Sequence, residues 1–113
     1  MAKSKAPRTF DEFIRTFPEA GKAWEILGKA SRGGPLAAKQ CELIKLGIAI
    51  ASRSEGAVHS AVRKSRPAGA GVAEQQQVLL LCASSIGLPA PVAAFTWMRD
   101  ELGSAHRRVA RKR

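Results

Sequence analysis

Hydrophobic residues recur along the chain at the three- and four-residue spacing of amphipathic helices, in six segments separated by turn signals. The first segment begins at Thr9, which forms a capping-box pattern with Glu12, and its apolar stripe consists of Phe10, Phe13, Ile14 and Phe17. We expect helices over residues 9–17, 18–32, 36–52, 54–66, 73–86 and 91–102. No stretch of four or more residues alternates in the manner of a strand, so the predicted fold class is all-α.

Proline, glycine and serine mark the ends of these segments. Pro18 suits the first turn of the second helix, where its missing N–H costs nothing. Ser54 is a good N-cap for the fourth helix, with Glu55 in the first turn where the helix dipole favours an acid. Gly103 follows the sixth apolar segment, and we expect it to end that helix.

The third segment is apolar on most of its faces. Its hydrophobic residues are Leu36, Ala37, Cys41, Leu43, Ile44, Leu46, Ile48, Ala49 and Ile50. A helix of this kind is normally covered on several sides by other helices or by another subunit. We therefore expect it to be the central helix of the fold.

Positive charge is concentrated at the two ends of the sequence. The net charge is +10, with 19 basic and nine acidic residues. Eight of the bases lie in residues 1–8 and 104–113, which contain no acid, so the rest of the chain is nearly neutral. We expect a flexible basic arm over residues 1–8, one helical domain over 9–103 and a basic C-terminal tail over 104–113. Such tails would bind polyanions weakly and without sequence preference.

The composition excludes several other classes of protein. The longest uninterrupted apolar run is Val78–Ala83, far shorter than the roughly 20 residues of a membrane span. No apolar stretch follows Lys3 and Lys5, so we expect neither a secretory signal nor membrane association, and a cytoplasmic location. Cys41 and Cys82 have no metal-ligand or redox spacing and are expected to be small buried hydrophobes. We expect no cofactor and no metal.

Four short segments occur in a distinctive order between residues 36 and 98. Residues 39–46 read KQCELIKL, residues 54–64 read SEGAVHSAVRK, residues 68–70 read AGA and residues 85–89 read SIGLP. In order and spacing they resemble the carboxymuconolactone decarboxylase family, which includes the alkyl hydroperoxidase D-like proteins. The resemblance implies a small all-helical domain of about six helices that assembles as a homo-oligomer, either a trimer or a hexamer.

The peroxidase branch of that family carries a Cys-x-x-Cys-x-x-x-His motif, with a Glu twelve residues before the first cysteine. The Glu is present here as Glu42, whereas Ser54 and Ala57 stand at the cysteine positions and Ala61 at the histidine position. A disulfide cycle needs two thiols, so peroxidase activity of the family's kind is not expected. For Ser54 we expect an N-cap role alone, because no base lies near it in sequence to activate the hydroxyl.

Glu42 and His59 are the remaining candidates for chemistry, and each has two interpretations. Glu42 is either a pocket carboxylate acting as general acid or base, or a half-exposed residue paired with Lys39 or Lys45 on the same helix. His59 is either a surface histidine paired with Glu55 one turn away, or a proton carrier that faces Glu42 across the helix pair.

Two functional hypotheses of different classes follow from these residues. The first is an enzyme that handles a small organic acid by acid–base chemistry without cysteine, of the decarboxylase or lactone type, with Glu42 and His59 as a proton-carrying pair. The second is a family member without catalysis that serves as an oligomeric binding or scaffold protein. A pocket that holds both side chains within hydrogen-bond reach would favour the enzyme.

Overall fold

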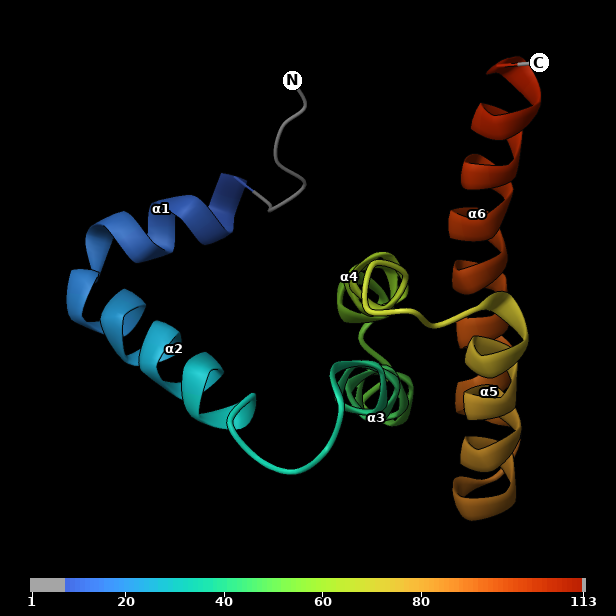
Figure 1. Ribbon diagram of the computed structural model, residues 1–113, viewed down its shortest axis with the longest axis horizontal. Coiled ribbons are helices and arrows are strands. Elements are labelled where there is room, and N and C mark those ends of the chain that lie inside the picture. Colours follow the sequence, from blue (N-terminus) through green and yellow to red (C-terminus); the bar gives the residue numbers. More distant parts are fainter. Residues whose placement is uncertain (1–7, 113) are drawn as a thin grey trace. The chain divides into compact units, whose positions relative to one another are not determined.

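Residues 8–112 form six helices and contain no strand, which confirms the all-α class (Figure 1). The computed structural model describes the backbone of these residues and the side chains of residues 8–101. The chain divides into two compact units, the first ending at Pro35 and the second beginning at Leu36. The helices are α1 (Arg8–Thr16), α2 (Pro18–Ser31), α3 (Ala38–Ala51), α4 (Glu55–Ser65), α5 (Val72–Ile86) and α6 (Pro89–Lys112).

The first unit holds α1 and α2, which meet at Gly21. A Cβ atom at Gly21 would lie 2.7 Å from Cγ2 of Ile14, so only glycine allows this close approach. Pro18 is the first residue of α2, as expected. The expected capping box at Thr9 is wrong, because α1 begins at Arg8 and Thr9 is already helical. Apart from Arg8, the predicted basic arm lies outside the described residues.

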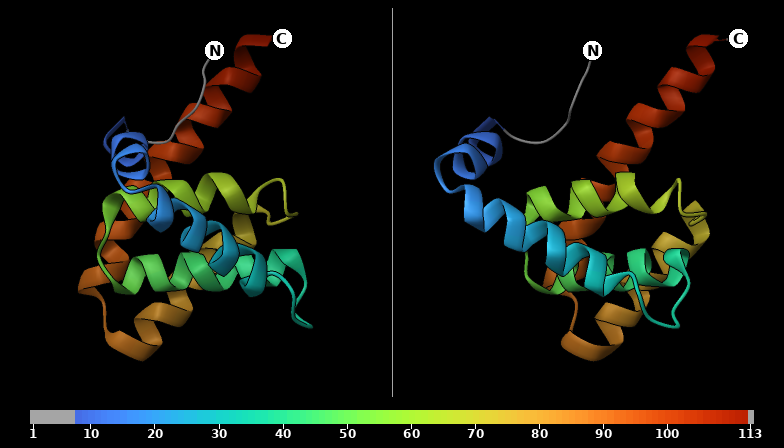
Figure 2. Two further views of the ribbon diagram at one scale, coloured as in Figure 1. Left: turned by 90° about the vertical axis from the view of Figure 1, so that its left-hand side faces the viewer. Right: turned by 60° about the vertical axis from the view of Figure 1, so that its left-hand side comes forward.

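In the second unit, α3 and α4 lie side by side and are joined by residues 52–54 (Figure 2). Ser54 caps α4, its hydroxyl accepting a hydrogen bond from the backbone N–H of Ala57 at 3.4 Å, which confirms the expected cap. Gly87 separates α5 from α6 with a φ of 93°, a conformation that L side chains rarely adopt.

The sixth helix is longer than the sequence pattern indicated. We expected residues 91–102 with an end at Gly103, but α6 continues through Gly103 to Lys112. The backbone of the basic C-terminal segment is therefore helical as far as the structure describes it, while its side chains lie outside the described part. No helix in the described part of the chain is both long enough and apolar enough to span a membrane.

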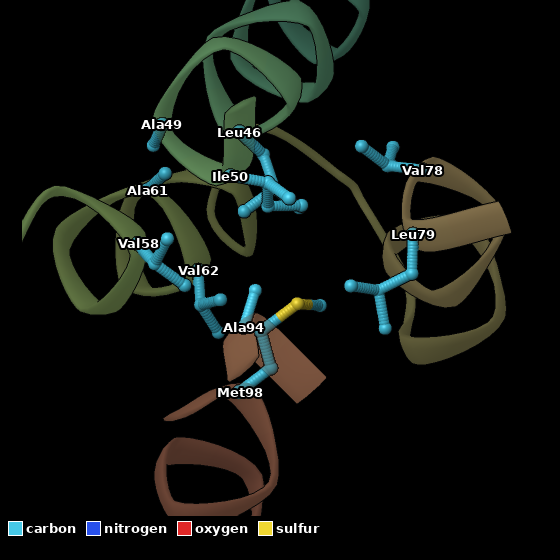
Figure 3. Close-up of a cluster of buried hydrophobic side chains, with 10 residues drawn as sticks. All are labelled: Leu46, Ala49, Ile50, Val58, Ala61, Val62, Val78, Leu79, Ala94 and Met98. Carbon is cyan, nitrogen blue, oxygen red and sulfur yellow. The ribbon is translucent and has the colours of Figure 1, made fainter. Parts of the chain in front are cut away.

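The hydrophobic core forms where α3 packs against the other three helices of its unit. Leu46 and Ile50 of α3 are completely buried, and so is Val62 of α4. Figure 3 shows the ten core side chains converging from four helices: Leu46, Ala49, Ile50, Val58, Ala61, Val62, Val78, Leu79, Ala94 and Met98. The central position expected for the third helix is confirmed. Neither cysteine is fully buried, contrary to expectation, and both thiols are free and half-buried.

A buried polar contact ties α5 to the C-terminal end of α4. The Gln75 side-chain amide donates hydrogen bonds to the Ser65 hydroxyl at 2.8 Å and to the Val62 carbonyl at 3.2 Å. Gln75 and Ser65 are both completely buried. Buried polar groups are costly unless they are paired, and here the side-chain N–H groups of Gln75 are paired with α4 while its Oε1 has no partner among the described residues.

Replacing Gly103 by Ala tests the length of α6. If the helix continues through this position, Gly103→Ala should raise the free energy of unfolding by about 0.5–1 kcal/mol, since alanine has the higher helical propensity. Gly56→Ala is the matched control in α4, where a Cβ meets nothing within 4 Å. Gly87→Ala should lower the free energy of unfolding, because the φ of 93° at this position is one that alanine rarely adopts. Urea denaturation measures all three, and a destabilised Gly103→Ala variant would contradict the continuous helix.

Candidate functional site

The candidate site is a cluster of charged side chains between α4 and α6, centred on His59. Nδ1 of His59 lies 2.8 Å from Oε1 of Glu101, a residue of α6. Nε2 of His59 lies 3.4 Å from Oε2 of Glu55, one turn earlier in α4. Arg63, one turn later in α4, donates from Nη1 to Oε2 of Glu101 at 3.4 Å. One histidine therefore stands between two carboxylates.

The side chains of this cluster differ in their access to solvent. The side chains of His59 and Glu101 are 24% and 21% exposed, whereas that of Glu55 is 60% exposed. The cluster therefore has a half-buried end at Glu101 and an open end at Glu55. Nε2 of His59 lies on the side of the open end at Glu55, and Nδ1 lies on the side of the half-buried Glu101.

The surroundings of Glu101 change the pKa of its carboxyl group. Partial burial opposes the charged form, but hydrogen bonds from His59 and Arg63 outweigh it and hold the pKa of Glu101 below its usual range. The carboxylate is thus negatively charged at neutral pH. An ionised Glu101 favours a proton on Nδ1 of His59, which it can accept as a hydrogen bond.

This arrangement is suited to proton transfer at Nε2. When the imidazole is neutral and Nδ1–H donates to Glu101, the lone pair of Nε2 is left at the open end of the cluster. The 3.4 Å separation of Nε2 from Glu55 is longer than an ordinary hydrogen bond of this kind, so Glu55 holds the ring only weakly. A histidine oriented by a carboxylate in this way can take up and return a proton.

Glu42, the other predicted proton carrier, is not joined to His59. Among the hydrogen bonds of the described residues, none links the two side chains. Glu42 lies nine residues before the end of α3 at Ala51, whereas His59 lies four residues after the start of α4 at Glu55. At 1.5 Å per residue this difference amounts to about 7 Å along the helix pair. Glu42 itself is half-buried.

The structure also shows which partners Lys39 and His59 have. Lys39 is not paired with Glu42 but with Glu74 of α5, its Nζ donating to Oε2 at 2.8 Å. The alternative pairing of His59 with Glu55 is present as the longer of the two histidine contacts. Within the described residues no three potential ligands are grouped in a way that could hold a metal ion.

Glu101 is the site residue that the sequence did not indicate. It lies 42 residues after His59, and nothing in its local sequence separates it from any other acid on the outer face of a helix. Its role depends on how α6 packs against α4, which periodicity does not specify. The one available signal was its position one residue before the end of the predicted helix, which is a poor place for an acid with respect to the helix dipole.

The ion cluster should give the protein a defined loss of stability in acid. The folded pKa of Glu101 is lower than the unfolded one, so its stabilising contribution is present above the unfolded value near 4.5 and is lost as the pH falls through the folded value. Glu101→Gln should therefore be less stable than the native chain at about pH 7, and the gap should narrow at about pH 3. Urea denaturation midpoints of both proteins at the two pH values measure this difference in stability. A difference that is the same at both pH values would contradict the ion cluster.

Comparisons with known proteins place this fold in a family. A sequence model described as the carboxymuconolactone decarboxylase family matches residues 18–100, from the start of α2 to the residue before Glu101. No curated protein and no solved structure matched the chain. The match covers well over half of the sequence and includes the helices that carry Glu42, Ser54 and His59. The chain therefore belongs to the carboxymuconolactone decarboxylase family.

Proposed function

We propose that the chain is an enzyme that performs acid–base chemistry on a small organic acid, with His59 as the proton carrier. The observation that carries this proposal is the 2.8 Å contact between Nδ1 of His59 and Oε1 of Glu101. A carboxylate that fixes one ring nitrogen leaves the other free to exchange a proton, and such groups contribute about 10²–10⁴-fold to catalysed rates. Glu101 is a positioning residue in this scheme.

The name of the family suggests the type of reaction. In a decarboxylation, the bond between the carboxylate carbon and its neighbour breaks, CO₂ leaves, and the electron pair stays on the neighbouring carbon. A protonated His59 would supply the proton that this carbon takes up, and solvent would restore it. Arg63, whose side chain is 36% exposed, would attract the carboxylate of the substrate. The reaction requires no thiol, in keeping with Ser54 and Ala57 at the two cysteine positions.

Two substitutions at the histidine contact test this proposal. A panel of β-keto acids and carboxylated lactones would first be screened for CO₂ release or loss of the substrate's absorbance. On a substrate that turns over, His59→Gln should lower kcat by about 10²-fold or more, and Glu101→Gln should lower it by about tenfold.

Asp100→Asn is the matched control for Glu101→Gln. It removes the same charge from the preceding residue of α6, which makes no hydrogen bond to His59 among the described contacts. Equal losses in the two variants would show that net charge matters and orientation does not, which would contradict the positioning role. Glu42→Gln tests the expected pairing of Glu42 with His59 directly. A decrease in kcat of about 10²-fold would show that Glu42 takes part in the reaction.

The alternative function is a binding or scaffold protein without catalysis. It is supported by the separation of Glu42 from His59, since a general acid–base pair of these two residues would need direct contact or one bridging water. If no member of the substrate panel turns over, the scaffold is the better description.

We also propose that the second unit assembles as a homo-oligomer, with the trimer or hexamer of the resembled family as the expected form. The support is a stripe formed by Leu88, which directly precedes α6, and by Val92 and Phe95 of α6; these residues are 65%, 59% and 46% exposed. The backbone N–H of Val92 donates to the Leu88 carbonyl, and the four- and three-residue spacing brings the three side chains to one face. Contiguous exposed apolar side chains of this size are typical of protein–protein contacts.

Charge placed in the middle of this stripe should disrupt assembly. Val92→Glu should shift the mass in solution towards that of the 12.1 kDa monomer, because the carboxylate would have to be buried without a partner. Leu80→Glu on α5 makes the same kind of change at a side chain that is 71% exposed and outside the stripe, and should leave the mass unchanged. Sedimentation measures both. A monomeric native chain at micromolar concentration would count against assembly altogether.

A further inference from the structure

A groove between α3 and α5 shares no residue with the His59 cluster, and we propose that it binds an elongated, uncharged and largely apolar small molecule. Its volume is about 480 Å³, which lies within the range of about 300–1,000 Å³ typical of small-molecule sites. The groove belongs entirely to the second unit. This proposal does not rest on the proposed acid–base function, because α4 and α6 take no part in the groove.

Aliphatic side chains make up much of both walls of the groove. Leu43 and Ile44 line it from α3, and Val78, Leu81 and Ile86 line it from α5. Ile44, Leu81 and Ile86 are each about half exposed, at 49%, 57% and 51%, so a ligand would remove apolar surface from water on both sides. The lining residues of α5 extend from Glu74 to Ile86, about 18 Å along the helix axis. This length favours an elongated ligand.

Residue 47, which lines the groove from α3, is a glycine. A Cβ atom there would lie 3.6 Å from Cγ1 of Val78 and 3.9 Å from Sγ of Cys82, both ordinary van der Waals distances. The glycine is therefore not required for close packing of α3 on α5. In the middle of a helix it costs about 0.8–1 kcal/mol relative to alanine. The space that it leaves lies between the two aliphatic walls.

Electrostatics select an uncharged ligand for this groove. Glu74 is the one ionised residue among its lining side chains, and Nζ of Lys39 lies 2.8 Å from its Oε2. The hydrogen bond from Lys39 and a second from the Gly71 N–H lower the pKa of Glu74, so the pair is fully charged and mutually neutralised at neutral pH. Burial raises the pKa of the Cys82 thiol, which therefore stays protonated. Neither a cation nor an anion finds an unpaired opposite charge there.

Neutral polar groups supply a limited capacity for hydrogen bonding. Gln77 and Ser85 also line the groove, Gln77 about one turn after Glu74 and Ser85 directly before Ile86 at the other end. An apolar body with one or two neutral donors or acceptors, such as a hydroxyl or a carbonyl, matches this distribution. A flat protein partner fits it less well, because the ion pair of Lys39 and Glu74 at one end would lose its contact with water.

Fluorescence of the neutral probe N-phenyl-naphthylamine tests the groove on the full-length protein. We expect a saturable increase in emission, with much weaker binding of the anionic probe anilinonaphthalene sulfonate. Gly47→Leu places a side chain in the groove and should weaken binding of the neutral probe by at least about tenfold. Gly56→Leu is the matched control, because it makes the same change in a helix where a Cβ meets nothing within 4 Å. Equal effects of the two variants would overturn the proposal.

A second measurement needs no substitution in the groove. In a Cys41→Ser background, Cys82 is the one remaining thiol of the chain, and its reaction with N-ethylmaleimide reports directly on the groove because Cys82 lines it. N-phenyl-naphthylamine should slow this reaction in proportion to the fraction of protein that it occupies, so that the rate falls towards zero at saturation. Unchanged reactivity at saturation would overturn the proposal. So would probe binding that weakens as the protein concentration and the mass in solution rise together, since a second copy would then be the occupant.

Discussion

The structure of the second unit depends on one constraint, which is that α3 has to be covered on several faces at once. Its apolar residues surround most of its circumference, and α4, α5 and α6 all contact it. Leu46 and Ile50 are completely buried as a result. Covering them fixes the positions of the other three helices, and with them the places of His59 and Glu101. The groove lies on the flank of α3 that α5 leaves partly uncovered.

The two polar features of this unit serve different purposes within that packing. The contact of Gln75 with Ser65 is completely buried and joins α5 to the C-terminal end of α4. The cluster around His59 is only partly buried, and there the hydrogen bonds from His59 and Arg63 lower the pKa of Glu101 despite the cost of partial burial. A fully buried cluster of this kind would carry a large desolvation cost, and a fully exposed one would be weakened by solvent screening. Partial burial therefore leaves His59 held by Glu101 and still in contact with solvent.

Much of the fold was predictable from the sequence, because the six apolar stripes and their proline, glycine and serine boundaries are local signals. The Ser54 cap and the central α3 are examples. The C-terminal end of α6 was not predictable in this way, because glycine is a weak stop signal and several of the residues beyond Gly103 are good helix formers. The candidate site was predictable only in part. His59 stood out as a histidine on a helix, but its partner Glu101 is brought to it by the packing of two helices, which no local pattern encodes.

The continuity of α6 gives the charged cluster a mechanical connection to the C-terminal segment. From Glu101 to Lys112 the backbone is one helical rod, about 16 Å long at 1.5 Å per residue. A load applied to the last turn would bend this rod first at Gly103, the residue of lowest helical propensity between Glu101 and Lys112. Glu101 lies on the core side of that glycine, three residues after Met98, which packs in the core. Movement of the last turns would therefore be absorbed at Gly103 before it reached the contact between Glu101 and His59.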